Sequence, residues 1–202
     1  RMRAWPDGKT RMLIKLSSAF YKHATAKTFG LLLLAYGIYM PVFFYANVPF
    51  GLTQIAPYAA NGGILDLDFF YSAAQAYQRL AGFGPDGRAT YLRILMGDLI
   101  YPGLLGVFMS VTLSLLLRRI VPAGGAWRYL NLLPIANMAA DYLENAMLIA
   151  LLAAYPAQLN GIAAIAGVAT AIKSVFGLLS FVALGVVLLI WVIQRVMRRP
   201  TT

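Results

Sequence analysis

The sequence predicts an all-α membrane protein with four transmembrane helices, and its composition, apolar runs and charge distribution lead to this prediction. Of the 202 residues, 60% are hydrophobic and only 12% are charged, and the mean hydropathy is +0.70. A soluble domain is about half apolar and about a quarter charged. A water-soluble globule and a disordered chain are therefore both excluded. Barrel strands are excluded too, because the apolar runs are continuous and do not alternate with polar residues.

Four apolar runs each reach the roughly 20 residues that cross a hydrocarbon layer of ~30 Å. They cover residues 28–48, 95–117, 129–154 and 174–193. The helical pattern of the last run extends over 161–197, which is about 55 Å at 1.5 Å per residue, so its first turns should project from the bilayer or tilt. No repeat or second domain is visible, and we expect residues 1–202 to form a single four-helix transmembrane domain.

The basic residues flank these runs, and this distribution predicts the topology. The net charge is +10, and the segment 49–94 balances three acids with three arginines. Because cytoplasmic loops are enriched in Lys and Arg, we expect both termini and the 118–128 loop inside, and 49–94 outside. We expect a bacterial inner (plasma) membrane protein. Nucleic acid is not an expected partner, because its binding needs a basic patch on a soluble surface. The basic clusters are seven residues within 1–27, then Arg118, Arg119 and Arg128, and finally Arg195, Arg198 and Arg199.

The segment 1–27 precedes the first run and mixes Lys and Arg with apolar residues. The apolar positions between Met12 and Tyr21 recur at spacings of three and four, which indicates a helix on the cytoplasmic interface. A solvated basic tail is the equal alternative. We expect the first run to be a retained signal anchor, because the basic segment is long and no clear cleavage site follows.

The outer end of the first run is rich in aromatic residues, and the segment after it contains a helical pattern. The aromatic residues indicate an interfacial belt, with a binding surface as the alternative. In the outer loop 49–94, Asp66 or Asp68 can cap a helix that runs to about Leu80. We expect this short amphipathic helix to lie on the outer leaflet over the bundle mouth. The aromatic residues are Tyr36, Tyr39, Phe43, Phe44, Tyr45 and Phe50.

Three of the seven acidic residues lie within the apolar runs: Asp98, Asp141 and Glu144. An Asp at the centre of a bilayer costs ~2.5–3.5 kcal/mol on insertion scales, so such residues face the interior and are functional by default. The third run carries most of the polar positions, which follow helical spacing on roughly one face. This polar stripe consists of Asn131, Pro134, Asn137, Asp141, Glu144 and Asn145.

Depth counted at 1.5 Å per residue from the cytoplasmic arginines places several polar residues together. Asp98, Glu144, Lys173 and Arg93 should meet in the outer third, and Tyr101 can donate a hydrogen bond to the group. Asp141 should lie deeper, with no basic residue at its level. A polar pocket open to the outer leaflet and a set of structural ion pairs both fit this pattern. Pro102 and Pro134 should each loosen a helix, which frees carbonyl groups.

Several kinds of chemistry lack the residues they need. The chain has no cysteine and only one histidine, His23, so disulfides, thiol chemistry, Cys or bis-His metal sites and haem ligation are not expected. No GxSxG, HExxH, Walker or dinucleotide motif is present. We therefore expect no catalytic residues, no metal and no cofactor, although the pocket has room for a bound lipid or pigment.

Four short motifs stand out, and they read Tyr77-x-x-Leu80, Gly84-x-x-Gly87-Arg88-x-x-Tyr91, Asp98-x-x-Tyr101-Pro102 and Asp141-x-x-Glu144-Asn145. Together they resemble a set of four-helix bacterial membrane proteins to which no activity is assigned. The resemblance covers about half the chain, and it implies that Arg88, Tyr91, Asp98, Asp141, Glu144 and Asn145 belong to one site. The four-span plan is also similar to claudin-like and quinone-linked thiol oxidoreductase layouts, but their cysteines are missing and neither function carries over.

We expect a non-enzymatic polytopic membrane protein, an accessory subunit or small binding protein of a membrane complex. A proton- or cation-coupled transporter that uses Asp98, Asp141 and Glu144 is the alternative, and a lipid-acting enzyme with Glu144 or Asp98 as general base is the second alternative. The expected partners are the lipid bilayer and either partner membrane subunits or further copies of the chain. Rows of small residues at spacing four, such as Gly106, Ser110 and Ser114, fit internal packing or oligomer contact.

Overall fold

The computed structural model describes residues 8–59, 63–121 and 125–197, and every regular element in these ranges is helical. The predicted all-α class is confirmed. Arg1, Arg3, Arg198 and Arg199 lie outside the described residues. Within the described ranges, four helical segments are long and apolar enough to cross a membrane: Ala26–Tyr45, Gly84–Ile120, Ala126–Ala154 and Asn160–Met197.

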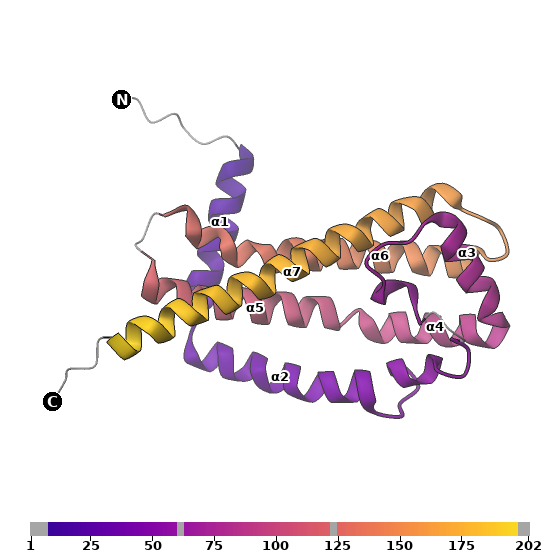
Figure 1. Ribbon diagram of the computed structural model, residues 1–202, viewed down its shortest axis with the longest axis horizontal. Coiled ribbons are helices and arrows are strands. Elements are labelled where there is room, and N and C mark those ends of the chain that lie inside the picture. The colour runs from indigo at the N-terminus through magenta and orange to yellow at the C-terminus, as the bar shows by residue number, and fades with distance from the viewer. Residues whose placement is uncertain (1–7, 60–62, 122–124, 198–202) are drawn as a thin grey trace.

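Four long helices run alongside one another and form the body of the molecule (Figure 1). Helix α6 packs closely against α7, and α5 contacts α2, α6 and α7. Helix α7 crosses the others obliquely, and its length matches the predicted 161–197 pattern. The four are α2 (Ala26–Tyr45), α5 (Tyr101–Ile120), α6 (Leu133–Ala154) and α7 (Asn160–Met197).

The basic N-terminal segment forms helix α1 (Gly8–His23), which lies crosswise at the end of the bundle where α7 finishes (Figure 1). Ser17 of α1 is completely buried and donates a hydrogen bond to Asn131 Oδ1 at 2.9 Å. Asn131 Nδ2 in turn donates to Ser114 Oγ of α5 at 2.9 Å. The described part of this segment is therefore a docked helix, and the solvated-tail alternative is wrong for it.

The second spanning segment is broken at the position where Pro102 predicts a loosened helix. Two residues separate the end of helix α4 (Gly84–Asp98) from the start of α5, and Pro102 lies in the first turn of α5. The break exposes the carbonyl groups of residues 97 and 99. Tyrosine hydroxyls on neighbouring helices satisfy both of them: Tyr39 donates to Gly97 at 2.7 Å, and Tyr142 donates to Leu99 at 3.0 Å. Pro134 similarly lies in the first turn of α6, after the 3₁₀ helix η3 (Ala126–Leu132).

The short helix expected after Asp66 and Asp68 is α3 (Ala73–Gly82), and it begins later than predicted. Ser72 caps it by accepting a hydrogen bond from the Gln75 amide, while the Gln75 side chain accepts from the Ser72 amide. This reciprocal capping box satisfies two of the free N–H groups at the helix start. The predicted cap at Asp66 or Asp68 is wrong because neither residue adjoins the first turn.

The apolar face of α3 packs on the bundle. Ala76, Tyr77 and Leu80 are buried in one cluster with Tyr91 of α4 and Leu148 of α6. Phe43 at the end of α2 belongs to the same cluster. Two 3₁₀ helices, η1 (Leu52–Ile55) and η2 (Leu65–Leu67), lie in the connection between α2 and α3.

Candidate functional site

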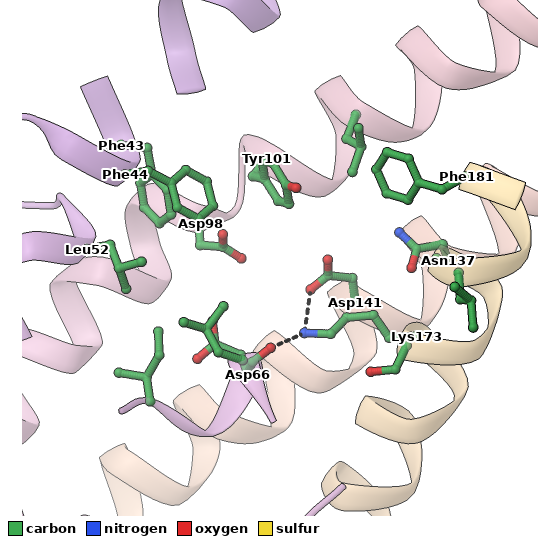
Figure 2. Close-up of a pocket in the computed structure, with 16 residues that line it drawn as sticks. Phe43, Phe44, Leu52, Asp66, Asp98, Tyr101, Asn137, Asp141, Lys173 and Phe181 are labelled. Atoms are coloured by element: carbon green, nitrogen blue, oxygen red, sulfur yellow. Dashed lines mark hydrogen bonds and ion pairs between the residues drawn. The ribbon is translucent and has the colours of Figure 1, made fainter. Parts of the chain in front are cut away.

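A cavity of about 410 Å³ lies between the end of α2, the connection that holds η1 and η2, the α4–α5 break, α6 and α7. Figure 2 shows that the side chains of Asp98, Asp141 and Lys173 are directed into it, and that Asp66 lies beside them. Asn137 also lines the cavity. The remaining wall is mostly aromatic and aliphatic, and it includes Phe43, Phe44, Leu52, Tyr101, Leu105 and Phe181.

Lys173 on α7 links the elements around the cavity. Its Nζ lies 2.5 Å from Glu144 Oε2 and 3.6 Å from Asp141 Oδ1, and it donates to the backbone carbonyl of Asp66 at 2.8 Å. Glu144 is 0% exposed and also accepts a hydrogen bond from Thr170 at 2.5 Å. Glu144 is not among the residues that line the cavity.

The expectation that Asp141 has no basic residue at its depth is wrong. Its carboxylate pairs with Lys173, which the sequence count places farther from the cytoplasmic end. The count assumes parallel helices whose flanking arginines lie at one level, whereas α7 runs obliquely (Figure 1). Arg128 lies in η3 and does not mark the start of the regular α6 helix, so counting from it misplaces Asp141. The long lysine side chain also extends the reach of its ammonium group.

Asp98 is the last residue of α4 and is only 6% exposed. Its Oδ2 accepts a hydrogen bond from Asn145 Nδ2 at 2.8 Å. Among the residues that the structure describes, no Lys, Arg or His nitrogen lies within 4.0 Å of this carboxylate. Asp98 is therefore a carboxylate in the cavity wall without an ion pair; Asp66 also has none, but its backbone carbonyl accepts from Lys173.

Asp66 is the site residue that sequence reasoning assigned to another role. Its Oδ1 accepts a hydrogen bond from the Tyr91 hydroxyl at 2.8 Å, so η2 is tied to α4. Burial raises the pKa of Asp66 above its ordinary value, and the nearby Lys173 ammonium and the Tyr91 hydroxyl offset part of this increase. An acid inside the apolar sequence Ile64-Leu65-Asp66-Leu67 was the available signal, since such a carboxyl is unlike one in a solvated loop.

The structure leaves two of the expected arginines outside the cavity. Arg93 donates to Thr90 Oγ1 at 2.8 Å, so its expected meeting with Glu144 and Lys173 is wrong. Arg93 is five residues from Asp98, and it therefore points about 140° away around the same helix. Arg88 stacks on the Tyr155 ring, 3.8 Å from its centre. Tyr91 does not line the cavity, but it donates a hydrogen bond to Asp66, which does.

Two members of the aromatic group at the end of α2 belong to the cavity. Phe43 is 3% exposed, and Phe43 and Phe44 both line the wall opposite Lys173 (Figure 2). The rings of these two residues are therefore part of the cavity wall. Figure 2 shows both rings near Asp98, and aromatic rings beside a carboxylate favour a cation because the face of an aromatic ring is electronegative.

The charges around the cavity are unequal. Four carboxyl groups (Asp66, Asp98, Asp141 and Glu144) surround a single ammonium group, which already contacts Glu144 and Asp141. Within the described ranges, no three Asp, Glu, His or Cys side chains lie close enough together to hold one metal ion. The spread of the carboxylates and the apolar wall suit a cationic group larger than a metal ion.

Comparisons with family models, with curated proteins and with solved structures gave no match. A proposal for the function of this chain therefore rests on the geometry of its own structure.

Proposed function

We propose that this chain is a non-enzymatic membrane protein, a small binding protein or accessory subunit, whose cavity binds an organic ammonium group attached to an apolar body. The amine headgroup of a lipid has this chemistry. The observation that carries the proposal is the position of Asp98, a buried carboxylate in the cavity wall with an amide as partner and no cation within 4.0 Å among the described residues. A cation placed there would compensate a charge that is costly to bury.

The size and lining of the cavity support an amphiphilic ligand. A volume of about 410 Å³ is within the range of small-molecule pockets, roughly 300–1,000 Å³. The ammonium group would lie between Asp98 and Asp141, and the apolar part would contact Phe43, Phe44 and Phe181. Lys173 would hold the carboxylates of α6 in place and would disfavour a second cation by repulsion.

We place the protein in a bacterial inner membrane with both termini in the cytoplasm. Helix α1, the end of α5 and the end of α7 lie at one end of the bundle, and basic residues are concentrated in them (Figure 1). Helices α3 and α4 lie at the opposite end, so the positive-inside rule directs that end outward. The cavity would then open in the outer half of the bilayer, with α3 covering the bundle there.

Binding of dodecylamine, with dodecanol as the neutral control, tests this proposal. We expect dodecylamine to raise the midpoint of thermal unfolding of the protein in an uncharged detergent, because a ligand that binds only the folded state stabilises it. The Asp98→Asn variant should lose this increase, and Asp86→Asn, which changes an exposed carboxylate of the same helix, should keep it. Equal stabilisation by both compounds, or an unchanged response of Asp98→Asn, would overturn the proposal.

A cation- or proton-coupled transporter is the second candidate, and the broken helix favours it. Asp98 lies at the break between α4 and α5, and transporters commonly bind ions where spanning helices are interrupted. In liposomes with an imposed pH gradient, the protein should then carry dodecylamine or protons across the membrane, and Asp141→Asn should abolish the flux. Unchanged flux in that variant would contradict the transporter hypothesis and would leave the binding-protein hypothesis.

A further inference from the structure

A second hollow lies at the other end of the bundle, between α5, η3, the start of α6 and α7. Its volume is about 560 Å³ and every residue in its wall is apolar. The hollow is open to the surroundings of the protein, since Trp127 is 68% exposed and Val186 is 50% exposed. We call it the apolar groove, and its wall includes Leu117, Ile120, Trp127, Val182, Val186 and Ile190.

The charge around the apolar groove has one sign. No Asp or Glu occurs in the sequence at 8–65, 99–140 or 145–202. The helices that form or border the groove therefore contribute only cations at this end. Arg128 lies over the Tyr21 ring at 5.0 Å from its centre, and Arg118 donates to the backbone carbonyl of Ala24 at 2.9 Å. Through these two contacts, the arginines hold α1 and the residue that follows it against the bundle.

Arg119 is a cation that adjoins the groove wall in the sequence. It is exposed, it adjoins the wall residue Ile120 in sequence, and its guanidinium lies 6.0 Å from the ring centre of Trp191. Trp191 adjoins the wall residue Ile190. An apolar wall therefore ends at a guanidinium and an indole ring, the side chains that are typical of the boundary between acyl chains and headgroups.

We propose that the apolar groove binds one anionic phospholipid, with an acyl chain along α7 and the phosphate at Arg119. Arginine binds phosphate oxygens in a bidentate geometry, and juxtamembrane basic residues attract anionic lipids. The charge argues against a second copy of the chain as occupant, because two basic ends would then face each other. The proposal concerns a different surface from the acid-lined cavity and does not depend on its ligand.

Native mass spectrometry tests the proposal. The purified protein, in an uncharged detergent, is equilibrated with equal amounts of phosphatidylglycerol and phosphatidylcholine that carry the same acyl chains. The detergent is then removed in the mass spectrometer, and the lipids that stay bound are counted. We expect one phosphatidylglycerol to be retained per chain. Arg119→Gln should lower the preference about five-fold, as expected from the loss of one interfacial cation. Lys15→Gln, an exposed cation on α1, should leave the preference unchanged.

Filling the groove provides the second measurement. Val186→Trp places a large ring in the groove and should abolish retention, whereas Leu188→Trp, an exposed position on α7 outside the groove wall, should not. Equal retention of both lipids, or retention of phosphatidylglycerol by Val186→Trp, would overturn the proposal. A dimer of the wild type that Val186→Trp dissociates would instead identify a second copy of the chain as the occupant.

Discussion

The two ends of this helical bundle are stabilised in different ways. At the end with the acid-lined cavity, Lys173 joins α7 to α6 and to the η2 connection through two carboxylates and a carbonyl group. At the basic end, the wall between α5 and α7 is apolar and opens into a groove. There the buried Asn131 connects α1 to α5, because it accepts a hydrogen bond from Ser17 and donates one to Ser114.

This difference follows from the cost of burying charge. A carboxylate taken out of water needs a partner with a defined position, so the buried acids fix the relative positions of α4, α6 and α7. In a lipid environment, an apolar side chain has no strong energetic preference for a protein neighbour over an acyl chain, because acyl chains are as apolar as leucine. The basic end can therefore leave an apolar groove open, whereas the acidic end lines its cavity with oriented side chains.

The largest expected effect is that of removing the lysine from the acid-lined cavity. Lys173→Ala leaves Glu144 buried without its counter-charge, and breaking a buried pair by removing one partner costs about 3–5 kcal/mol. We expect this loss in the free energy of unfolding, measured by denaturation in mixed micelles. The double variant Lys173→Met and Glu144→Gln should recover part of the loss, because Glu144 is then neutral and only Asp141 is left without its cation. A single variant as stable as the wild type would show that the ion pairs do not stabilise this end.

Sequence reasoning predicted the spans better than the site, for a physical reason. Continuous apolar runs of sufficient length define spanning helices almost by themselves, so the fold class and the long α7 helix are confirmed. The intramembrane acids also predicted a shared interior, and Asp98, Asp141 and Lys173 do line one cavity. Counting residues along a helix, however, gives depth and says little about direction. The count therefore placed Arg93 in the group and separated Asp141 from Lys173.

The connection between α2 and α3 was the least predictable part. Asp66 belongs to a short 3₁₀ turn with no long periodic pattern, and its role depends on Tyr91 of another element. Its position becomes evident only when α3, capped by Ser72, packs onto the bundle. The pairing of Asp68 with Arg79 at 2.7 Å is likewise a contact between this connection and α3 that no spacing rule gives.

Substitutions of two glycines on α7 allow the packing at the two ends of the bundle to be compared. A Cβ on Gly167 would overlap the backbone carbonyl oxygen of Tyr71, whereas a Cβ on Gly185 would meet nothing within 4 Å. Overpacking against backbone costs typically 1–3 kcal/mol, so Gly167→Ala should lower the free energy of unfolding by about 3 kcal/mol. Gly185→Ala should raise it by about 0.8 kcal/mol through helix propensity. Similar results for both variants would contradict the contrast in packing between the ends.

The docking of α1 gives a smaller effect, and Ser17→Ala measures it. Without the hydroxyl, the buried Asn131 Oδ1 loses its donor, and an unsatisfied buried acceptor costs about 1–3 kcal/mol. Because α1 is docked at the edge of the bundle, this energy should appear as local opening. Trypsin should then cleave faster after Lys22 and Lys27. Ser18→Ala, at an exposed position of the same helix, is the control and should be cleaved at the wild-type rate.

The smallest expected effect is a pH dependence that arises from Asp66. Burial raises its pKa in the folded protein above the ordinary value of 3.8, and Asp68 contributes to the increase, while Lys173 and the Tyr91 hydroxyl oppose it. Below about pH 4 the group is protonated in the folded and unfolded states alike, and its stabilising contribution is fully present. The contribution is lost as the pH rises through the raised pKa, because ionisation then favours the unfolded chain. The thermal midpoint of the wild type should consequently fall more between pH 4 and neutral pH than that of Asp66→Asn. Asp86→Asn, which alters an exposed carboxylate, should follow the wild type, and identical pH profiles for all three proteins would show that Asp66 carries no such linkage.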